Sequence, residues 1–373
     1  MIESANYGCQ PVEACRESPK ASQKIPRPLG RGILFAWNAR GQMPARSPSR
    51  ILFVRTDRLG ETILNIPAIA TLKAAFPQAF LAVLVRSELA PLLADVPGVD
   101  AVLASPKKVS PWWWLRAARL SRLLKVWRFD AAIISNPKKE LHLAAWLAGI
   151  PTRIGYNRKW GMLLTHRVQD RKAGGDRHEV ECNLDLARAL GCASLVPPHW
   201  IVPHEQERAE AAELLRREGL NPQEAFIVVH PWTSNPIKQW PLERFRELIG
   251  MIGRRFAKPV VVIGGAEETG RVASLLPLAE CGRVINLVGR LTLCQLAAVL
   301  QQGGVLVSND SGPAHLAAAV GASAVVLFGT TTSGTGPRRW GPWGDRHVMI
   351  HRPTMAEIAV QEVVDALESM ICV

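Results

Sequence analysis

Short apolar runs alternate with amphipathic stretches along this chain, and this alternation restricts the fold more than any other feature. The first series of apolar runs is ILFV (51–54), LAVLV (81–85), DAVL (100–103) and DAAIIS (130–135). The second series is FIVVH (226–230), VVVIGG (260–265), VINLVG (284–289), VLVSND (305–310) and AVVLFG (324–329). Helical patterns separate them at 61–75, 112–127, 140–148, 207–218, 241–255, 291–302 and 312–320. Buried strands that alternate with helices predict α/β halves with doubly wound parallel sheets.

The chain divides into three predicted regions. Residues 1–49 are basic and rich in proline, which indicates a flexible N-terminal extension. Residues 50–200 form the first α/β domain, and residues 201–373 form the second, which ends in a helix at about 355–370. A Pro-rich polar stretch indicates a linker near 197–222.

Composition and charge limit the partners. The formal net charge of +13 favours an anionic partner such as a phosphorylated small molecule or a membrane face. No zinc-finger spacing or aromatic RNA-binding motif favours nucleic acid, and no cysteine spacing or Asp-x-Asp pair predicts a metal site. Neither a secretory signal nor the ~20 apolar residues of a membrane span is present, so we expect a cytoplasmic protein.

The segment SNDSGPAH (308–315) follows a strand and opens a helix. Gly312 allows close approach of a ligand to the backbone, and Pro313 suits a first helical turn. The partial positive charge of a helix N-terminus and the Ser311 hydroxyl predict a phosphate site there. The alternative is that Asp310 or Ser311 only caps the helix, and that His315 is a packed core histidine.

A second turn of the same kind follows FIVVH. Thr233, Ser234 and Lys238 place two hydroxyls and one ammonium group after that strand. Open α/β sheets bind ligands at the carboxyl ends of their strands. The two turns together therefore predict a diphosphate site.

These segments carry a family resemblance. HPWTSNPIKQWPLERF, VVVIGGAEE and SNDSGPAHLAAAVG resemble the C-terminal half of glycosyltransferase family 9, the ADP-heptose:lipopolysaccharide heptosyltransferases. ILFVRTDRLGETILNIPAIATLKAAFP is similar to the opening of that family, and the resemblance extends over residues 50–350. It implies a GT-B architecture, in which two Rossmann-like domains face a cleft, with the donor bound by the C-terminal domain and the acceptor by the N-terminal one. It also implies transfer of a heptose, with inversion, from a nucleotide diphosphate sugar to lipopolysaccharide core.

The resemblance also assigns roles. The proposed base of the family is an Asp, and Glu61 stands at that position here, with Asp57 as the alternative. The extra methylene of Glu61 moves its carboxylate by about an ångström, which puts activity or the usual acceptor in doubt. Glu61 could instead only complement its helix dipole. Lys238, Asp310, Ser311 and Gly312 are expected at the diphosphate of an ADP-sugar donor, without a metal.

An acidic residue after the GG turn binds ribose in this family. Glu267 and Glu268 both follow Gly264 and Gly265, and Glu268 is the favoured candidate. The same segment lacks G-x-G-x-x-G spacing, which argues against a dinucleotide cofactor.

The acceptor is expected to be an anionic, lipid-linked glycan. The candidates for contacting it are Asp57, Lys138, Lys139, Arg153 and Arg158. In the helix within 111–129, one predicted apolar stripe consists of Leu120, Leu123, Leu124 and Trp127, and the opposite side carries Arg119, Arg122 and Lys125. Such a helix, preceded by three tryptophans, can lie on the cytoplasmic membrane face, although a packed helix with a solvated basic side is the alternative.

Two other functions remain open from the residues alone. One is a catalytically silent protein that binds a nucleotide sugar or a membrane surface, which Glu61 and the unusual Trp232 make credible. The other is a nucleotide-sugar 2-epimerase with the same GT-B architecture, against which the RTDRLGETILNIP segment argues.

Overall fold

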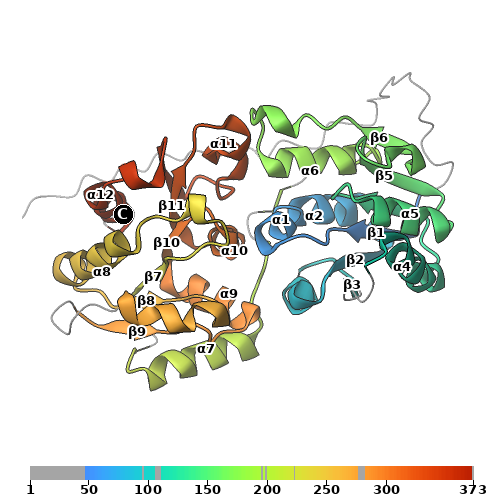
Figure 1. The fold of residues 1–373 in the computed structure, drawn as a ribbon. Coiled ribbons are helices and arrows are strands. Elements are labelled where there is room, and N and C mark those ends of the chain that lie inside the picture. Colours follow the sequence, from blue (N-terminus) through green and yellow to red (C-terminus); the bar gives the residue numbers. More distant parts are fainter. Residues whose placement is uncertain are drawn as a thin grey trace, which may run out of the picture. The chain divides into compact units, whose positions relative to one another are not determined.

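The computed structural model describes residues 47–94, 96–105, 111–194, 196–197, 200–221, 223–275 and 282–371. The predicted extension at 1–49 lies outside these residues except for 47–49. Two six-stranded parallel sheets dominate the described part, and both belong to one compact unit of the chain (Figure 1). The prediction of two doubly wound Rossmann-like sheets is confirmed. No helix within the described ranges is long and apolar enough to cross a membrane.

The N-terminal sheet has the strand order β3-β2-β1-β4-β5-β6, all parallel. Its strands are β1 (Arg50–Val54), β2 (Phe80–Arg86), β3 (Ala101–Ser105), β4 (Ala131–Ile134), β5 (Thr152–Tyr156) and β6 (His166–Val168). Its helices are α1 (Leu59–Ile63), α2 (Ile66–Ala75), α3 (Ala90–Ala94), α4 (Trp113–Trp127), α5 (Lys139–Leu147) and α6 (Glu179–Arg188). The strand order reverses between β1 and β4, and loops at such a switch point open a crevice for ligands.

Alternate side chains of β1 enter different cores. Ile51 and Phe53 pack in the cluster that includes α2 and α6, whereas Leu52 and Val54 pack in the cluster under α4 and α5. This period of two explains why the strands are nearly continuous apolar runs, since both faces of the sheet are covered.

The C-terminal sheet repeats the same design with the order β12-β11-β10-β7-β8-β9. Its strands are β7 (Ile227–His230), β8 (Val260–Val262), β9 (Val284–Asn286), β10 (Val305–Asn309), β11 (Ser323–Gly329) and β12 (His347–Arg352). Its helices are α7 (Glu205–Arg217), α8 (Leu242–Phe256), α9 (Leu293–Gly303), α10 (Gly312–Ala319), α11 (Pro337–Trp340) and α12 (Val360–Ile371). Helices α8 and α12 lie side by side against one face of the sheet, and α7 packs beside α9 (Figure 1). The reversal falls between β7 and β10.

The structure differs from the sequence prediction in some elements. The helix expected at 61–75 is two helices, because the chain breaks at Leu64 and Asn65 ahead of Pro67 in the first turn of α2. Strands β5, β6 and β12 were not predicted, since all three contain charged residues and two of them are edge strands. Helix α6 was also missed. The division at residue 200 stays a prediction.

Candidate active site

The loops expected to bind the donor meet at one edge of the C-terminal sheet. Strands β10, β7 and β8 are neighbours, and parallel strands end at the same edge. Asp310 follows β10, Lys238 lies in the loop after β7, and Glu268 lies in the turn after β8. Three segments that are far apart in the sequence therefore end at the same edge of the sheet.

Lys238 and Asp310 form an ion pair across the switch point between β7 and β10. Burial raises the pKa of the Asp310 carboxyl, against the lowering effect of the Lys238 ammonium group. The nearby Glu61 carboxylate raises it further. The pair presents a partly exposed ammonium group at the site, while Asp310 itself is buried.

The first turn of α10 is not capped by a side chain. Ser311 occupies the cap position, but its side chain makes no cap hydrogen bond to the helix. Its hydroxyl instead lies 2.8 Å from the Ser308 hydroxyl and 3.2 Å from His230 Nδ1. Burial lowers the pKa of His230 to about 4, so the ring is neutral at physiological pH. The structure therefore contradicts the alternative that the Ser311 side chain only caps this helix.

Asn309 joins the two turns predicted to bind the donor, and the sequence analysis gave it no role. Its Nδ2 donates to the Pro231 carbonyl at 2.8 Å, and its Oδ1 accepts from the Trp240 backbone N–H at 3.0 Å. The signal was present, because a buried amide at a strand end commonly binds the backbone of the next loop. Trp232 is fully buried against Gly264, where a Cβ would lie 2.7 Å from the indole ring. Trp232 is thus a packing residue.

The remaining donor candidates have local partners. Glu268 accepts a hydrogen bond from the Gly265 N–H at 2.5 Å, and burial raises the pKa of its carboxyl. Thr233 Oγ1 accepts from the Asn235 N–H at 3.4 Å. Within the described residues, no three His, Cys, Asp or Glu side chains group as metal ligands.

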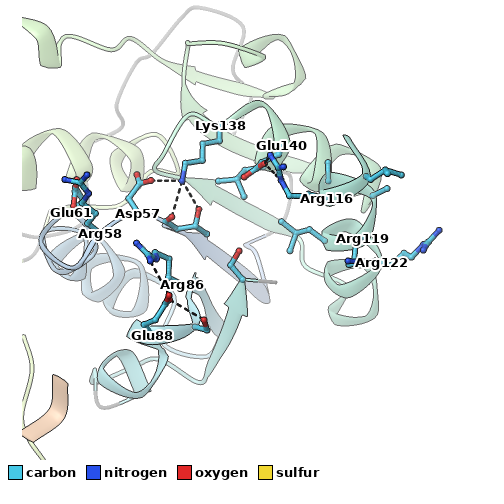
Figure 2. Close-up of a pocket in the computed structure, with 18 residues that line it drawn as sticks. Asp57, Arg58, Glu61, Arg86, Glu88, Arg116, Arg119, Arg122, Lys138 and Glu140 are labelled. Carbon is cyan, nitrogen blue, oxygen red and sulfur yellow. Dashed lines mark hydrogen bonds and ion pairs between the residues drawn. The ribbon is translucent and has the colours of Figure 1, made fainter. Parts of the chain in front are cut away.

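A pocket of about 730 Å³ opens at the matching edge of the N-terminal sheet (Figure 2). Six cationic and four acidic side chains are among its lining. They are Arg58, Arg86, Arg116, Arg119, Arg122 and Lys138, with Asp57, Glu61, Glu88 and Glu140. Three ion pairs lie among these lining residues, Lys138 with Asp57, Arg86 with Glu88 and Arg116 with Glu140 (Figure 2). The pocket suits an anionic or polyhydroxylated ligand.

Asp57 and Lys138 occupy the switch point of this sheet. Lys138 Nζ lies 2.6 Å from Asp57 Oδ1, and Arg55 Nε lies 3.4 Å from Oδ2. Burial is the largest single influence and by itself would raise the pKa of Asp57, but Arg55, Lys138 and Asn136 together outweigh it and hold the pKa below its usual value. A carboxylate held ionised by two cations is a weak proton acceptor, so Asp57 is the poorer base candidate.

Glu61 is placed differently. It lies in the first turn of α1 and lines the pocket, and its carboxylate has no hydrogen-bond or ion-pair partner in the part of the chain that is described. Its backbone carbonyl accepts from Asn65 Nδ2 at 2.6 Å. The carboxylate is therefore free to meet a ligand, while its backbone is held.

Helices α1 and α10 pack directly against each other through two glycines. A Cβ on Gly60 would lie 2.5 Å from His315 Cδ2, and a Cβ on Gly312 would lie 3.0 Å from Leu59. Arg58 adds a hydrogen bond of 3.3 Å to the Ser234 hydroxyl. This contact brings the predicted base, Glu61, beside the predicted diphosphate turn.

His315 packs against Gly60 in this contact between α1 and α10. Its ring is buried, and burial lowers its pKa to about 3, followed by the effect of nearby cationic groups. Among the described residues, its Nδ1 has no hydrogen-bond partner. The structure places it as a neutral packing group under α1, which is the alternative role considered from the sequence.

Three of the acceptor candidates do not line the pocket. Lys139 lies over the Trp113 ring, 4.3 Å from its centroid. Arg153 Nε donates to the Leu163 carbonyl at 2.7 Å, and Arg158 pairs with Asp170 at 3.0 Å. Each is engaged in local structure, and only Lys138 and Asp57 of the acceptor candidates lie in the pocket. The arginines of the pocket were missed as acceptor residues, although RTDRLG placed Arg58 beside the candidate base.

Comparison with known proteins decides the family. The model of "Glycosyltransferase family 9 (heptosyltransferase)" matches residues 117–369. The chain belongs to glycosyltransferase family 9. A putative glycosyltransferase of Haemophilus influenzae is 27% identical over 83% of this chain and 90% of that protein. Lipopolysaccharide heptosyltransferase 2 of Escherichia coli is 26% identical over 76% and 83%.

Solved structures share the architecture. A family 9 glycosyltransferase from Veillonella parvula has a TM-score of 0.79 at 22% identity and covers 87% of this chain and 97% of its own. Heptosyltransferase II of Escherichia coli has a TM-score of 0.72 at 23% identity, with coverage of 87% and 98%. The expected GT-B fold is confirmed, and this family 9 protein is a glycosyltransferase.

The contact between α1 and α10 leads to a prediction on stability. Gly60→Ala should lower the free energy of unfolding by about 1–3 kcal/mol, because the new Cβ would overlap the buried His315 ring, which must shift to accommodate it. Gly270→Ala is the matched control, since nothing lies within 4 Å of its Cβ. Urea denaturation of both proteins measures the difference. Equal stabilities would contradict a fixed contact at this point.

Proposed function

We propose that this family 9 glycosyltransferase transfers a heptose, with inversion, from ADP-heptose to an anionic lipid-linked glycan of the lipopolysaccharide core. One observation carries the proposal: α1 packs on α10, so that the unpartnered Glu61 carboxylate lies close to the Lys238–Asp310 pair and the Ser311 turn. Relatives named lipopolysaccharide heptosyltransferases, and a solved heptosyltransferase of Escherichia coli with ADP, support this choice of donor and acceptor.

The chemistry needs a base and a leaving-group site on opposite sides of the sugar. We infer that Glu61 takes the proton of the acceptor hydroxyl while the oxygen of that hydroxyl bonds to the anomeric carbon. The bond from that carbon to the diphosphate oxygen breaks on the opposite face, and the electron pair leaves with the diphosphate. Lys238 and the uncapped start of α10 stabilise the departing charge. These groups supply positive charge without a cofactor.

The acceptor binds in the pocket of the N-terminal sheet. Arg119 and Arg122 line it and have no ion-pair partner among the described residues, whereas Arg86, Arg116 and Lys138 are paired with acids. Phosphate or carboxylate groups of a core glycan would pair with the two unpartnered arginines. How far Glu in place of Asp at position 61 slows transfer depends on the position of the acceptor in this pocket.

The membrane contact that we propose lies on α4. Trp112, Trp114 and Val126 are 60%, 49% and 81% exposed, and α4 contains no acidic residue. Leu120 and Leu124 of the predicted apolar stripe are buried in the core and Leu123 is 37% exposed, so this stripe as a whole is not the side that meets the membrane. The exposed surface thus combines these apolar residues with Arg119, Arg122, Lys125 and Arg128, a combination that favours the anionic cytoplasmic face of the inner membrane.

The two alternatives give different assay results. A silent binding protein would bind ADP-heptose without forming product, and an epimerase would release nucleotide or altered donor without an acceptor product. Family membership favours transfer.

Glu61→Gln should abolish turnover, with a loss of about 10²–10⁴-fold in kcat, because an amide cannot accept the proton. Donor affinity should stay unchanged, since Lys238 and the α10 turn are intact. Glu243→Gln is the control, as Glu243 is also a first-turn glutamate but is exposed on α8. Single-turnover assays with ADP-heptose and a lipopolysaccharide acceptor measure the rate. An active Glu61→Gln enzyme would exclude Glu61 as the base.

Lys238→Ala should weaken ADP-heptose binding by roughly 10–100-fold, since a charge-assisted hydrogen bond contributes about 1.5–3 kcal/mol. Transfer should slow as well. Lys258→Ala removes a lysine from the loop between α8 and β8, which has no ion pair among the described residues, and this variant should bind donor normally. Calorimetric titration with donor gives both affinities. Unchanged binding in Lys238→Ala would remove Lys238 from the donor site.

The double variant Lys125→Gln/Arg128→Gln should bind anionic vesicles about 30-fold more weakly, at about 1 kcal/mol per basic residue near the surface. The double variant Arg246→Gln/Lys258→Gln makes the same change of charge elsewhere and should bind like the parent. Sedimentation with phosphatidylglycerol and phosphatidylcholine vesicles, at low and high salt, measures the binding. If the two double variants bound equally, the α4 surface would not be the contact.

A further inference from the structure

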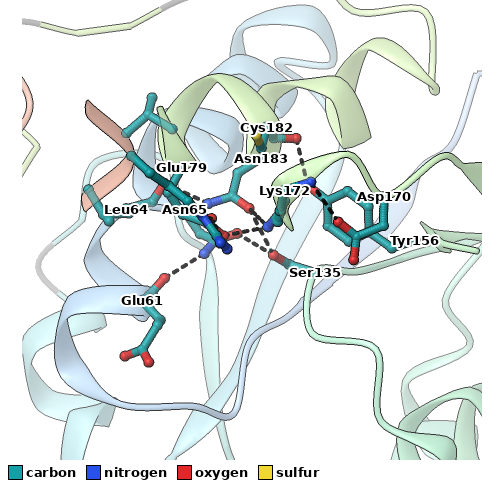
Figure 3. A network of polar contacts seen from close by, with 12 residues as sticks. Glu61, Leu64, Asn65, Ser135, Tyr156, Asp170, Lys172, Glu179, Cys182 and Asn183 are labelled. Carbon is teal, nitrogen blue, oxygen red and sulfur yellow. Dashed lines mark hydrogen bonds and ion pairs between the residues drawn. The ribbon is translucent and has the colours of Figure 1, made fainter. Parts of the chain in front are cut away.

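The end of helix α1 is held by side chains rather than by its own length. Helix α1 has only five residues, too few to be stable alone. Asn65 Nδ2 donates to the Glu61 carbonyl at 2.6 Å, and Asn183 Nδ2 donates to the Leu64 carbonyl at 3.1 Å (Figure 3). Both amides are fully buried. The backbone that carries Glu61 is therefore fixed by Asn65 and Asn183.

Asn183 is oriented in turn by a lysine. Its Oδ1 accepts from Lys172 Nζ at 3.2 Å and lies 3.4 Å from the Ser135 hydroxyl (Figure 3). Because an ammonium group can only donate, the oxygen of Asn183 must face Lys172 and its NH₂ group must face Leu64. Lys172 is held over the Tyr156 ring, 4.3 Å from its centroid.

Glu179 connects this arrangement to the other half of the molecule. Its side chain is 1% exposed and pairs through one oxygen with Lys172. Its other oxygen accepts two hydrogen bonds from Arg339 of α11, from Nε at 3.1 Å and from Nη2 at 3.0 Å. The neighbouring His178 Nε2 lies 2.9 Å from the Gly341 carbonyl. The start of α6 is thus bound to the α11 segment.

We propose that Arg339 is a positioning residue for Glu61, acting through Glu179, Lys172 and Asn183. The proposal rests on the proposed role of Glu61 as the base. A buried carboxylate between two cations depends on both of them. When Arg339 is absent, Glu179 and Lys172 must rearrange, the hydrogen bond from Lys172 to Asn183 weakens, and the end of α1 is released. The placement of the base then depends on the contact of α11 with Glu179, and α11 belongs to the half proposed to bind the donor.

The test compares Arg339→Met with Arg338→Met, a change at the exposed neighbouring arginine. Hydrogen exchange is followed at the amides of Thr62, Leu64 and Asn65, which are hydrogen-bonded in α1. We expect exchange at least ~5-fold faster there in Arg339→Met, with β10 and β11 unchanged. The kcat for transfer should fall on the order of 10–100-fold, as for a displaced catalytic group, while the KM for ADP-heptose stays within about twofold. Arg339→Lys should show a smaller increase in exchange and a smaller loss of kcat than Arg339→Met.

Asn183→Ala tests the far end of the same connection. It should give the same local exchange and kcat loss, and the double variant Arg339→Met/Asn183→Ala should be no worse than either single one, since both act on α1 by one route. Additive effects would overturn the proposal. So would unchanged α1 exchange in Arg339→Met, or faster exchange that extends through both sheets, which would indicate a role in general stability.

The exchange measurement separates this inference from the function it rests on. If Glu61→Gln remained active while Arg339→Met still released α1, the role of Glu61 as base would fail and the coupling of α11 to α1 would stand. If Glu61→Gln were inactive and α1 exchange did not respond to Arg339→Met, the base would stand and the coupling would fail.

Discussion

The contact between α1 and α10 is the constraint on which the rest of the site depends. Each helix places a glycine where the other places a side chain, so His315 lies on Gly60 and Leu59 lies on Gly312. This close approach sets one candidate base beside one candidate diphosphate turn. A neutral, buried histidine suits the position, because a charged ring without a partner would be costly there.

The two halves use the same physical device at equivalent places. In each sheet the strand order reverses between the first and fourth strands, and a lysine–aspartate pair joins the two loops that leave them. The pair is Lys138 with Asp57 in the N-terminal sheet and Lys238 with Asp310 in the C-terminal sheet. Burial raises the pKa of both carboxyls, but at Asp57 the combined effect of Arg55, Lys138 and Asn136 outweighs it, whereas at Asp310 burial prevails over Lys238, so the two pKa values shift in opposite directions. The same topology thus provides two differently tuned charged edges.

Buried polar groups hold the loops at these sheet edges in place, because apolar packing alone does not specify the positions of loop backbones. Asn309 holds the two donor turns together, and Asn183 and Asn65 hold the helix of Glu61. Hydrogen bonds from buried amides are directional, and leaving one unmade is costly. A few amides and one buried carboxylate therefore fix the backbone around the candidate site residues, whereas the sheets supply the frame.

The sequence by itself determined the two α/β halves and the strands that are continuous apolar runs, because these are local patterns with a short physical explanation. It also singled out the two turns predicted to bind the donor, and Glu61 as the predicted base. It did not reveal β5, β6 or β12, whose charged residues hide the strand pattern, or the break between α1 and α2. Only the tertiary structure assigned His315 to packing, removed Lys139, Arg153 and Arg158 from the pocket, and joined Glu179 to Arg339. Those outcomes depend on which side chains of distant segments meet, and the period of a strand or helix carries no information about such partners.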